Sequence, residues 1–374
     1  MKKTVFTQSA SIIIGTIIGA GILGLPFAFM KAGFLTGLMV LLIISSCVII
    51  LALFLGEITL RTNGKHQVSG YVGVYLGKHL KNIQAILLLF GMYGALLAYT
   101  IGQGQILSNL FGGSKVLWSI IAYIFLSILV VKGLALIKRI EFIIGLLILG
   151  FIFVIGVLST PHINIDYWHG FSLAKFFIPY GAILFACSGL VAIPEAKEII
   201  SASKGQAHLR SAILVGYLIP ILIYISFTAI IIAVTGPGTT EIATIGLTSV
   251  IGPAALLIGS LFSIVAMSSG FMALGNAIKE IYQYDYKLKP ILSITLTLAV
   301  PILMFLLGLR DFFGVVSLAG ALSVGLTGLI VIIVFWRARK NGKRKPEYTV
   351  PSWLAIPASI IISIMLIIGL IYTI

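Results

Sequence analysis

The chain has 374 residues, of which 60% are hydrophobic and 9% are charged. Soluble domains carry about a quarter charged residues, so this composition cannot build an aqueous surface, and the bilayer must be the solvent for most of the chain. A net charge of +15 would suit a nucleic-acid-binding protein, but the positions of the charges decide that question.

Eleven apolar stretches are expected to cross a bilayer as helices, for which about 20 residues are needed, and the fourth of them is short. They are expected at residues 9–31, 35–58, 84–110, 116–131, 141–159, 174–193, 210–234, 252–278, 291–308, 312–336 and 351–373. A cleaved signal peptide is disfavoured for the first stretch because the run is too long and leads straight into another span. The sequence therefore predicts an all-α, polytopic membrane protein.

Lysine and arginine gather in alternate connections between these spans. With a cytosolic N-terminus, the cytosolic segments hold 21 of the 25 basic residues, and the outer segments hold Lys31, Lys115, Lys175 and Arg310. The positive-inside rule accounts for this alternation without a nucleic acid partner. We therefore expect a multi-pass protein of the cytoplasmic membrane, with the N-terminus in the cytosol and the C-terminus outside.

Two spans are interrupted by glycine and proline. The first reads SIIIGTIIGAGILGLPFAFMKAG from Ser11, and the sixth reads FFIPYGAILFACSGLVAIPEAKE from Phe176. Because they are five spans apart, they would occupy corresponding positions in two antiparallel five-helix repeats, which is the pattern of many transporters. We expect repeats at about 9–159 and 174–336 and an extra helix at about 351–373. A simple packing role for these glycines stays open, since GxxxG patterns usually pack helices.

A helix broken within the membrane exposes backbone N–H and C=O groups that hydrocarbon cannot satisfy. The outer half of the first span would begin around Ala20, Gly21 and Ile22, where free N–H groups and the positive end of the helix dipole suit a carboxylate. The sixth span would offer carbonyls and the Ser188 hydroxyl to an ammonium group. Together the two breaks match the charges of an α-amino acid.

Polar residues in two further spans are candidates for the same site. The third span contains Tyr99, Gln103 and Gln105, and two buried amides are costly in a membrane, so at least one of them is expected to face a cavity. In the eighth span, Ser268 and Ser269 lie near the middle. Serines there pack or bond to their own helix more often than they bind ions, so both roles stay open.

The remaining chemistry-bearing residues do not form a catalytic or metal site. Of the ten acids, only Glu57 approaches a span interior, and Arg61 follows four residues later, which predicts a structural ion pair. The two cysteines give neither a disulfide framework nor a CxxC pattern. We therefore expect neither an enzyme nor a bound cofactor.

The connection at 61–83 is expected to contain a short helix. Val68, Tyr71, Val72 and Tyr75 recur there at helical spacing. Such a helix would lie along the cytosolic membrane interface.

The segment GTIIGAGILGLPFAFMKAG, from Gly15, resembles the first-helix signature of the amino acid/auxin permease family, within the amino acid–polyamine–organocation superfamily. The segment GAILFACSGLVAIPE, from Gly181, is similar to the sixth helix of that family. The resemblance implies the leucine-transporter type of fold, with two inverted five-helix repeats and alternating access.

Carried over to this sequence, the resemblance implies which residues bind the substrate. It places the substrate carboxylate at the backbone of Gly19, Ala20 and Gly21. It places the substrate amine near Phe185, Ala186 and Ser188. Some relatives have a histidine after the sixth-span break, whereas Leu190 follows Gly189 here.

Sodium-coupled relatives bind an ion between the first and eighth helices. The matching positions here are Gly15, Ile18, Val265, Ser268 and Ser269. The fifth span lacks the interior lysine of some proton-coupled relatives, which favours sodium, although other relatives use protons without that lysine. Sodium and proton coupling both remain open.

These observations predict an ion-driven symporter of amino acids. Neutral substrates, including large apolar or aromatic ones, are favoured because the predicted site, with Ile22, Tyr99 and Gln103 beside the breaks, holds no charged side chain. The alternative is a membrane sensor that binds an amino acid without moving it.

Overall fold

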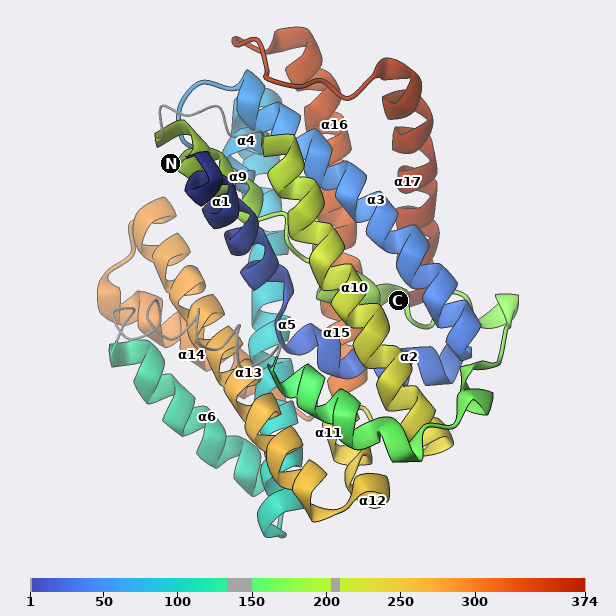
Figure 1. Cartoon of the computed structure of the whole chain (residues 1–374). Coiled ribbons are helices and arrows are strands. Elements are labelled where there is room, and N and C mark those ends of the chain that lie inside the picture. Colours follow the sequence, from blue (N-terminus) through green and yellow to red (C-terminus); the bar gives the residue numbers. More distant parts are fainter. Residues whose placement is uncertain (1, 133–149, 203–208, 374) are drawn as a thin grey trace.

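A computed structural model describes residues 2–132, 150–202 and 209–373 (Figure 1). These residues form helices and contain no strand, which confirms the all-α prediction. The main helices are α1 (Lys2–Ile17), α2 (Leu25–Ala32), α3 (Phe34–Arg61), α4 (Val68–Leu76), α5 (Lys78–Phe111), α6 (Lys115–Lys132), α8 (Tyr180–Ala186), α9 (Ala192–Ala202), α10 (Leu209–Thr235), α13 (Pro253–Glu280), α14 (Pro290–Leu306), α15 (Phe312–Ala319), α16 (Leu326–Asn341) and α17 (Ser352–Thr373).

Within the described residues, seven helices are long and apolar enough to cross a membrane, or eight when the bent first span is included. The other predicted spans correspond to shorter apolar helices, at Gly150–His162 and in α14, and to the pair α8 and α9. The first part of the predicted fifth span, 141–149, lies outside the described residues. The polytopic class is confirmed, and the count of eleven stays a prediction.

The two interrupted spans lie side by side and run in opposite directions. The first half of one, α1, packs against the second half of the other, α9, while α2 and the 3-10 turn η1 (Ala20–Gly24) pack against α8. Helix α5 passes beside them and contacts α13, α6 and α15. In Figure 1 the N-terminus, α4 and α9 lie near the top, and α11 (Ala243–Gly246) and α12 (Thr248–Ile251) near the bottom. The charge pattern predicts that the bottom is external, and we call it the outer side.

The connection at 61–83 contains the expected short helix, α4. Val68, Tyr71 and Val72 are buried, as their helical spacing predicted. The Tyr75 hydroxyl lies 2.8 Å from the hydroxyl of Thr62, which fixes α4 against the end of α3.

Glu57 is fully buried and forms the predicted ion pair with Arg61, at 2.8 Å. A second cation, Arg339 of α16, lies 3.0 Å from the same carboxylate, and the backbone N–H of Val350 donates to it at 2.7 Å. One carboxylate therefore joins α3, α16 and the segment before α17. The sequence pattern missed Arg339 because it is 282 residues from Glu57 along the chain.

Candidate functional site

The predicted interruption of the first span is present. Helix α1 ends at Ile17, Gly19 is extended with φ −136° and ψ −161°, and η1 begins at Ala20. The axis bends by 46° across this break. Gly19 has no side chain to cap the turn, so the first N–H groups of η1 have no side-chain cap, and the Ile22 N–H donates to the Gly19 carbonyl at 3.4 Å.

The sixth span is interrupted as well. Helix α8 ends at Ala186, and α9 begins at Ala192. Between them, the N–H of Ser188 donates to the Phe185 carbonyl at 3.2 Å, and the N–H of Gly189 donates to the Cys187 carbonyl at 2.8 Å. The Cys187–Gly189 stretch thus breaks the helix where the sequence predicted.

The two interruptions pack directly against each other. A Cβ atom added to Gly21 would lie 2.9 Å from the Cα of Ala186 and 3.3 Å from the Phe185 ring. A Cβ atom on Gly189 would lie 2.5 Å from the Ile17 side chain. Glycine is therefore required at both breaks for this approach. Gly21, Phe185 and Ala186, predicted separately from two distant segments, come together here.

Tyr224 of α10 joins the two breaks, and the sequence analysis missed it. Its hydroxyl lies 2.6 Å from the Ile17 carbonyl and 3.0 Å from the Ala186 carbonyl, so one hydrogen is shared between two acceptors. These carbonyls end the two half-helices and have lost their helical partners. The signal was a tyrosine inside the apolar run IPILIYISF, because a buried tyrosine hydroxyl needs a partner.

We expect the Tyr224→Phe variant to lose most uptake of the substrate, by about tenfold or more, because both carbonyls become unsatisfied. Leaving a buried polar group unpaired costs about 1–3 kcal/mol, which is enough to shift the positions of the half-helices. Initial uptake rates in proteoliposomes measure this effect.

The matched control is Tyr123→Phe. Tyr123 of α6 also donates to a backbone carbonyl, that of Leu298, but neither residue contacts a break. We expect this variant to keep uptake within about twofold, since a single neutral hydrogen bond contributes only about 1 kcal/mol. Equal losses in both variants would show that Tyr224 acts on stability alone.

Tyr99 and Gln103 of α5 face the same region. The Tyr99 hydroxyl lies 4.0 Å from the Cβ position of Gly19, and its ring packs against Gly270 of α13. The Gln103 side-chain amide donates to the Ser268 hydroxyl at 3.1 Å. The Gln103 amide, which would be unfavourable in the membrane without a hydrogen-bond partner, therefore has one within the bundle.

Among the described residues, no contact seen in the structure brings the five predicted ion-binding residues together around one point. Ser268 is engaged by Gln103, and Gly15 is exposed and borders open space. Ile18, Val265 and Ser269 are half-buried. An ion site at these five positions stays a prediction.

The breaks are covered on the outer side. Ile242 and Leu247, which flank α11, are fully buried, and the hydroxyls of Thr244 and Ser263 lie 2.8 Å apart. Helix α11 packs on η1 and α2. We call residues 239–251 the outer cover. Beside it, the Phe312 ring lies between Gly24 and Gly102, 3.5 and 3.3 Å from their Cβ positions.

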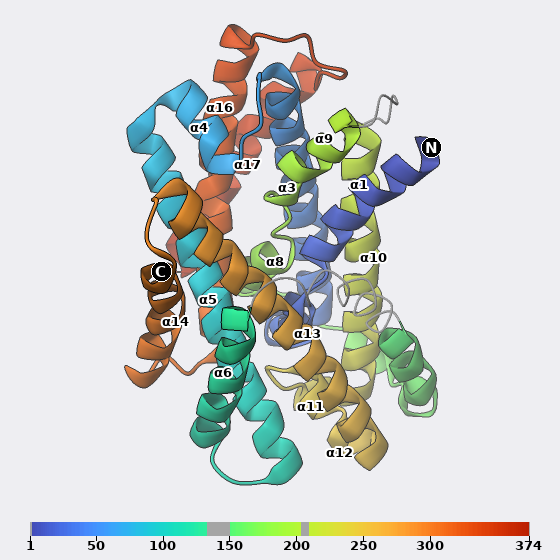
Figure 2. The ribbon, with the colours of Figure 1, turned by 90° about the vertical axis from the view of Figure 1, so that its left-hand side faces the viewer.

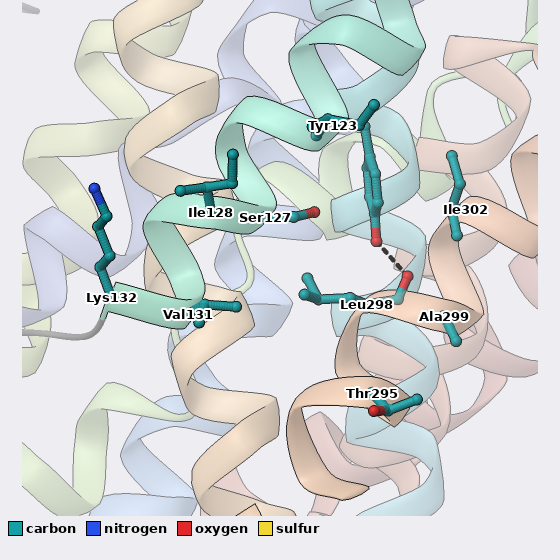
Figure 3. A pocket seen from close by; sticks show the side chains of 10 residues that line it. Tyr123, Ser127, Ile128, Val131, Lys132, Thr295, Leu298, Ala299 and Ile302 are labelled. Carbon is teal, nitrogen blue, oxygen red and sulfur yellow. Dashed lines mark hydrogen bonds between the residues drawn. The ribbon is translucent and has the colours of Figure 1, made fainter. Parts of the chain in front are cut away.

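A separate groove of about 570 Å³ lies between α6 and α14 (Figure 3). Its lining is mainly apolar, with Tyr123, Ser127, Thr295 and Lys132 as the polar residues. Neither helix carries a residue of the predicted site, so the groove is not part of it.

An all-helical membrane bundle in which two antiparallel, interrupted spans meet has the architecture of a secondary transporter. A family model for the tryptophan/tyrosine permease family matches residues 2–373, and the chain belongs to that family. It is also similar to "Glutamine transporter 2" of Aliivibrio fischeri, with 23% identity over 97% of this chain and 96% of that protein.

The family corrects one prediction. The amino acid/auxin permease family is a different branch of the superfamily, so the branch named from the first-span signature was wrong and the superfamily was right. The glycines in that signature serve a broken helix, and a backbone requirement of this kind does not distinguish branches. Membership of a permease family also means that the chain is a transporter rather than an enzyme.

Proposed function

We propose that the chain is an ion-coupled symporter that moves neutral amino acids across the cytoplasmic membrane by alternating access, with inverted repeats at about 9–159 and 174–336. The observation that carries the proposal is the contact of the two interruptions, at Gly21 and Ala186. Breaks in the membrane persist only where a ligand, water or protein supplies partners. Tyr224 satisfies the Ile17 and Ala186 carbonyls, and we assign the N–H groups at Ala20 and Gly21 to the substrate carboxylate.

Neutral and aromatic substrates fit the surroundings of the breaks. Tyr99, Phe185 and Tyr224 lie beside them and carry no charge at neutral pH. Aromatic rings pack well on aromatic side chains. The family description names tryptophan and tyrosine, and the relative from Aliivibrio fischeri is named for glutamine. We therefore rank tryptophan, tyrosine and phenylalanine first and glutamine next.

A competition panel in proteoliposomes tests the function. All twenty amino acids compete with labelled tryptophan or glutamine, with sodium and proton gradients imposed separately. We expect accumulation of at least one neutral amino acid against its gradient, which a sensor would not give. Failure to accumulate or exchange any amino acid contradicts the proposal.

Sodium coupling is tested with Ser269→Ala. If Ser268 and Ser269 hold sodium, this variant should lose sodium-driven uptake by about tenfold, because a coordinating oxygen is removed. Ser363→Ala is the matched control, since the Ser363 hydroxyl bonds to Ser359 within α17. Wild-type uptake that ignores sodium and follows a pH gradient would instead assign the coupling to protons.

A further inference from the structure

A pocket of about 530 Å³ opens on the outer side, and no role described above uses it. It lies where the end of α5 and the start of α6 meet the first residues of the outer cover. Its polar lining includes Gln105, Ser108, Asn109, Lys115, Thr240 and Glu241. The volume falls within the range of about 300–1,000 Å³ that is typical of small-molecule sites. We call it the outer pocket.

The outer pocket carries one charge of each sign. Glu241 is half-buried and accepts a hydrogen bond from the Gln105 amide, while Lys115, also in the lining, is exposed. Within the described residues no ion pair joins Glu241 to Lys115, so neither charge neutralises the other directly. An amino acid in water is a zwitterion, and its ammonium and carboxylate groups are complementary to these two side chains.

The outer pocket lies on the route from the outer side to the breaks. Gln105 is two residues beyond Gln103 on α5, and at about 1.5 Å per residue Asn109 is roughly 9 Å further out than Gln103. The Phe312 ring fills the space between Gly24 and Gly102 beneath it. A solute arriving from the outer side therefore reaches the pocket first, and it reaches the breaks only after Phe312 and the outer cover move.

We propose that the outer pocket binds the zwitterionic amino acid before the outer cover opens, with the substrate ammonium beside Glu241 and the substrate carboxylate beside Lys115. This inference rests on the proposed transport function. Side chains bind both substrate charges at this first site, whereas the site proposed at the breaks uses backbone groups and the Ser188 hydroxyl. Gln105 positions the Glu241 carboxylate through its hydrogen bond.

Uptake kinetics in intact cells, where the protein has one orientation, test this role. Glu241→Gln and Lys115→Gln should each raise the external KM by about tenfold, because each removes a charge-assisted contact, and should leave kcat within about twofold. The matched controls are Asp166→Asn and Lys175→Gln, which remove the same charges from exposed outer positions away from the pocket. These controls should keep the wild-type KM.

Cysteine protection tests occupancy directly. The two native cysteines, Cys47 and Cys187, are buried, so a membrane-impermeant thiol reagent should react with an introduced cysteine only. Asn109→Cys places a thiol on the exposed rim of the pocket. Saturating substrate should slow its labelling several-fold, and this protection should disappear when Glu241→Gln is added.

The pH dependence provides a third measurement. Burial, and next the negative charge of Asp311, raise the pKa of Glu241, against the opposing effects of the Gln105 hydrogen bond and of Lys31 and Lys115. A protonated Glu241 cannot attract an ammonium group. The KM should therefore rise as the pH falls through this raised pKa, measured with equal pH on both sides of the membrane, and Glu241→Gln should remove the rise.

These outcomes separate the outer pocket from the transport function itself. Wild-type protein that transports no amino acid contradicts the proposed function. Active wild-type protein whose KM is unchanged by Glu241→Gln and Lys115→Gln overturns the outer pocket alone. Protection of the Asn109→Cys thiol that persists with Glu241→Gln also overturns it.

Discussion

Replacing Gly21 with alanine is expected to abolish measurable uptake. The added Cβ atom would lie 2.9 Å from the Cα of Ala186, which is backbone and cannot move aside as a flexible side chain could. The two breaks would be pushed apart, and the N–H groups that are proposed to bind the carboxylate would shift with them. Overpacking of this kind costs about 1–3 kcal/mol, so folded protein should remain measurable while uptake falls by more than tenfold.

Gly24→Ala is the matched control, three residues further along the same span. Its Cβ atom would lie 3.5 Å from the Phe312 ring, an ordinary contact distance. We expect uptake within about twofold of wild type, because the added methyl group makes only this ordinary contact. Full uptake by Gly21→Ala would contradict the requirement for close contact between the breaks.

Replacing Glu57 with glutamine is expected to cause the largest loss of stability. The carboxylate is fully buried between Arg61 and Arg339, at 2.8 and 3.0 Å. A neutral amide would leave two partly buried guanidinium groups without their counter-charge, and breaking a buried pair costs about 3–5 kcal/mol. The yield of monodisperse protein and its thermal unfolding in detergent measure the loss.

The matched control is Glu198→Gln. Glu198 pairs with Lys65 at 3.0 Å, but the Lys65 side chain is 78% exposed. Surface pairs contribute about 0–1 kcal/mol, so this variant should unfold close to the wild-type temperature. Similar losses of stability in the two variants would contradict the larger contribution that we expect from the buried Glu57 carboxylate.

Local features of the chain were predictable. The breaks in the first and sixth spans are visible because the conformational freedom of glycine and the missing N–H of proline act on the residues beside them. The pair of Glu57 with Arg61 and the helix α4 were predicted for the same reason, since helical spacing places nearby residues together. The membrane class followed from composition alone.

Contacts between distant segments were not predictable from one sequence. Tyr224 and Arg339 were missed, although each satisfies groups that the sequence analysis had identified. Glu241 lies in a connection between helices, and only the fold brings it to Gln105 and Lys115. The periodicity of apolar and polar residues predicts which face of a helix is buried, but it does not predict which other segment packs against that face.

The sequence by itself determined that this protein crosses the membrane many times and that its first and sixth spans are broken. Both follow from local chemistry, because the bilayer requires apolar residues and the broken backbone requires glycine. The tertiary structure decided that the two breaks touch, that Tyr224 joins them, and that a pocket of mixed charge lies on their outer side. These depend on packing between segments far apart in the chain, which no local preference specifies.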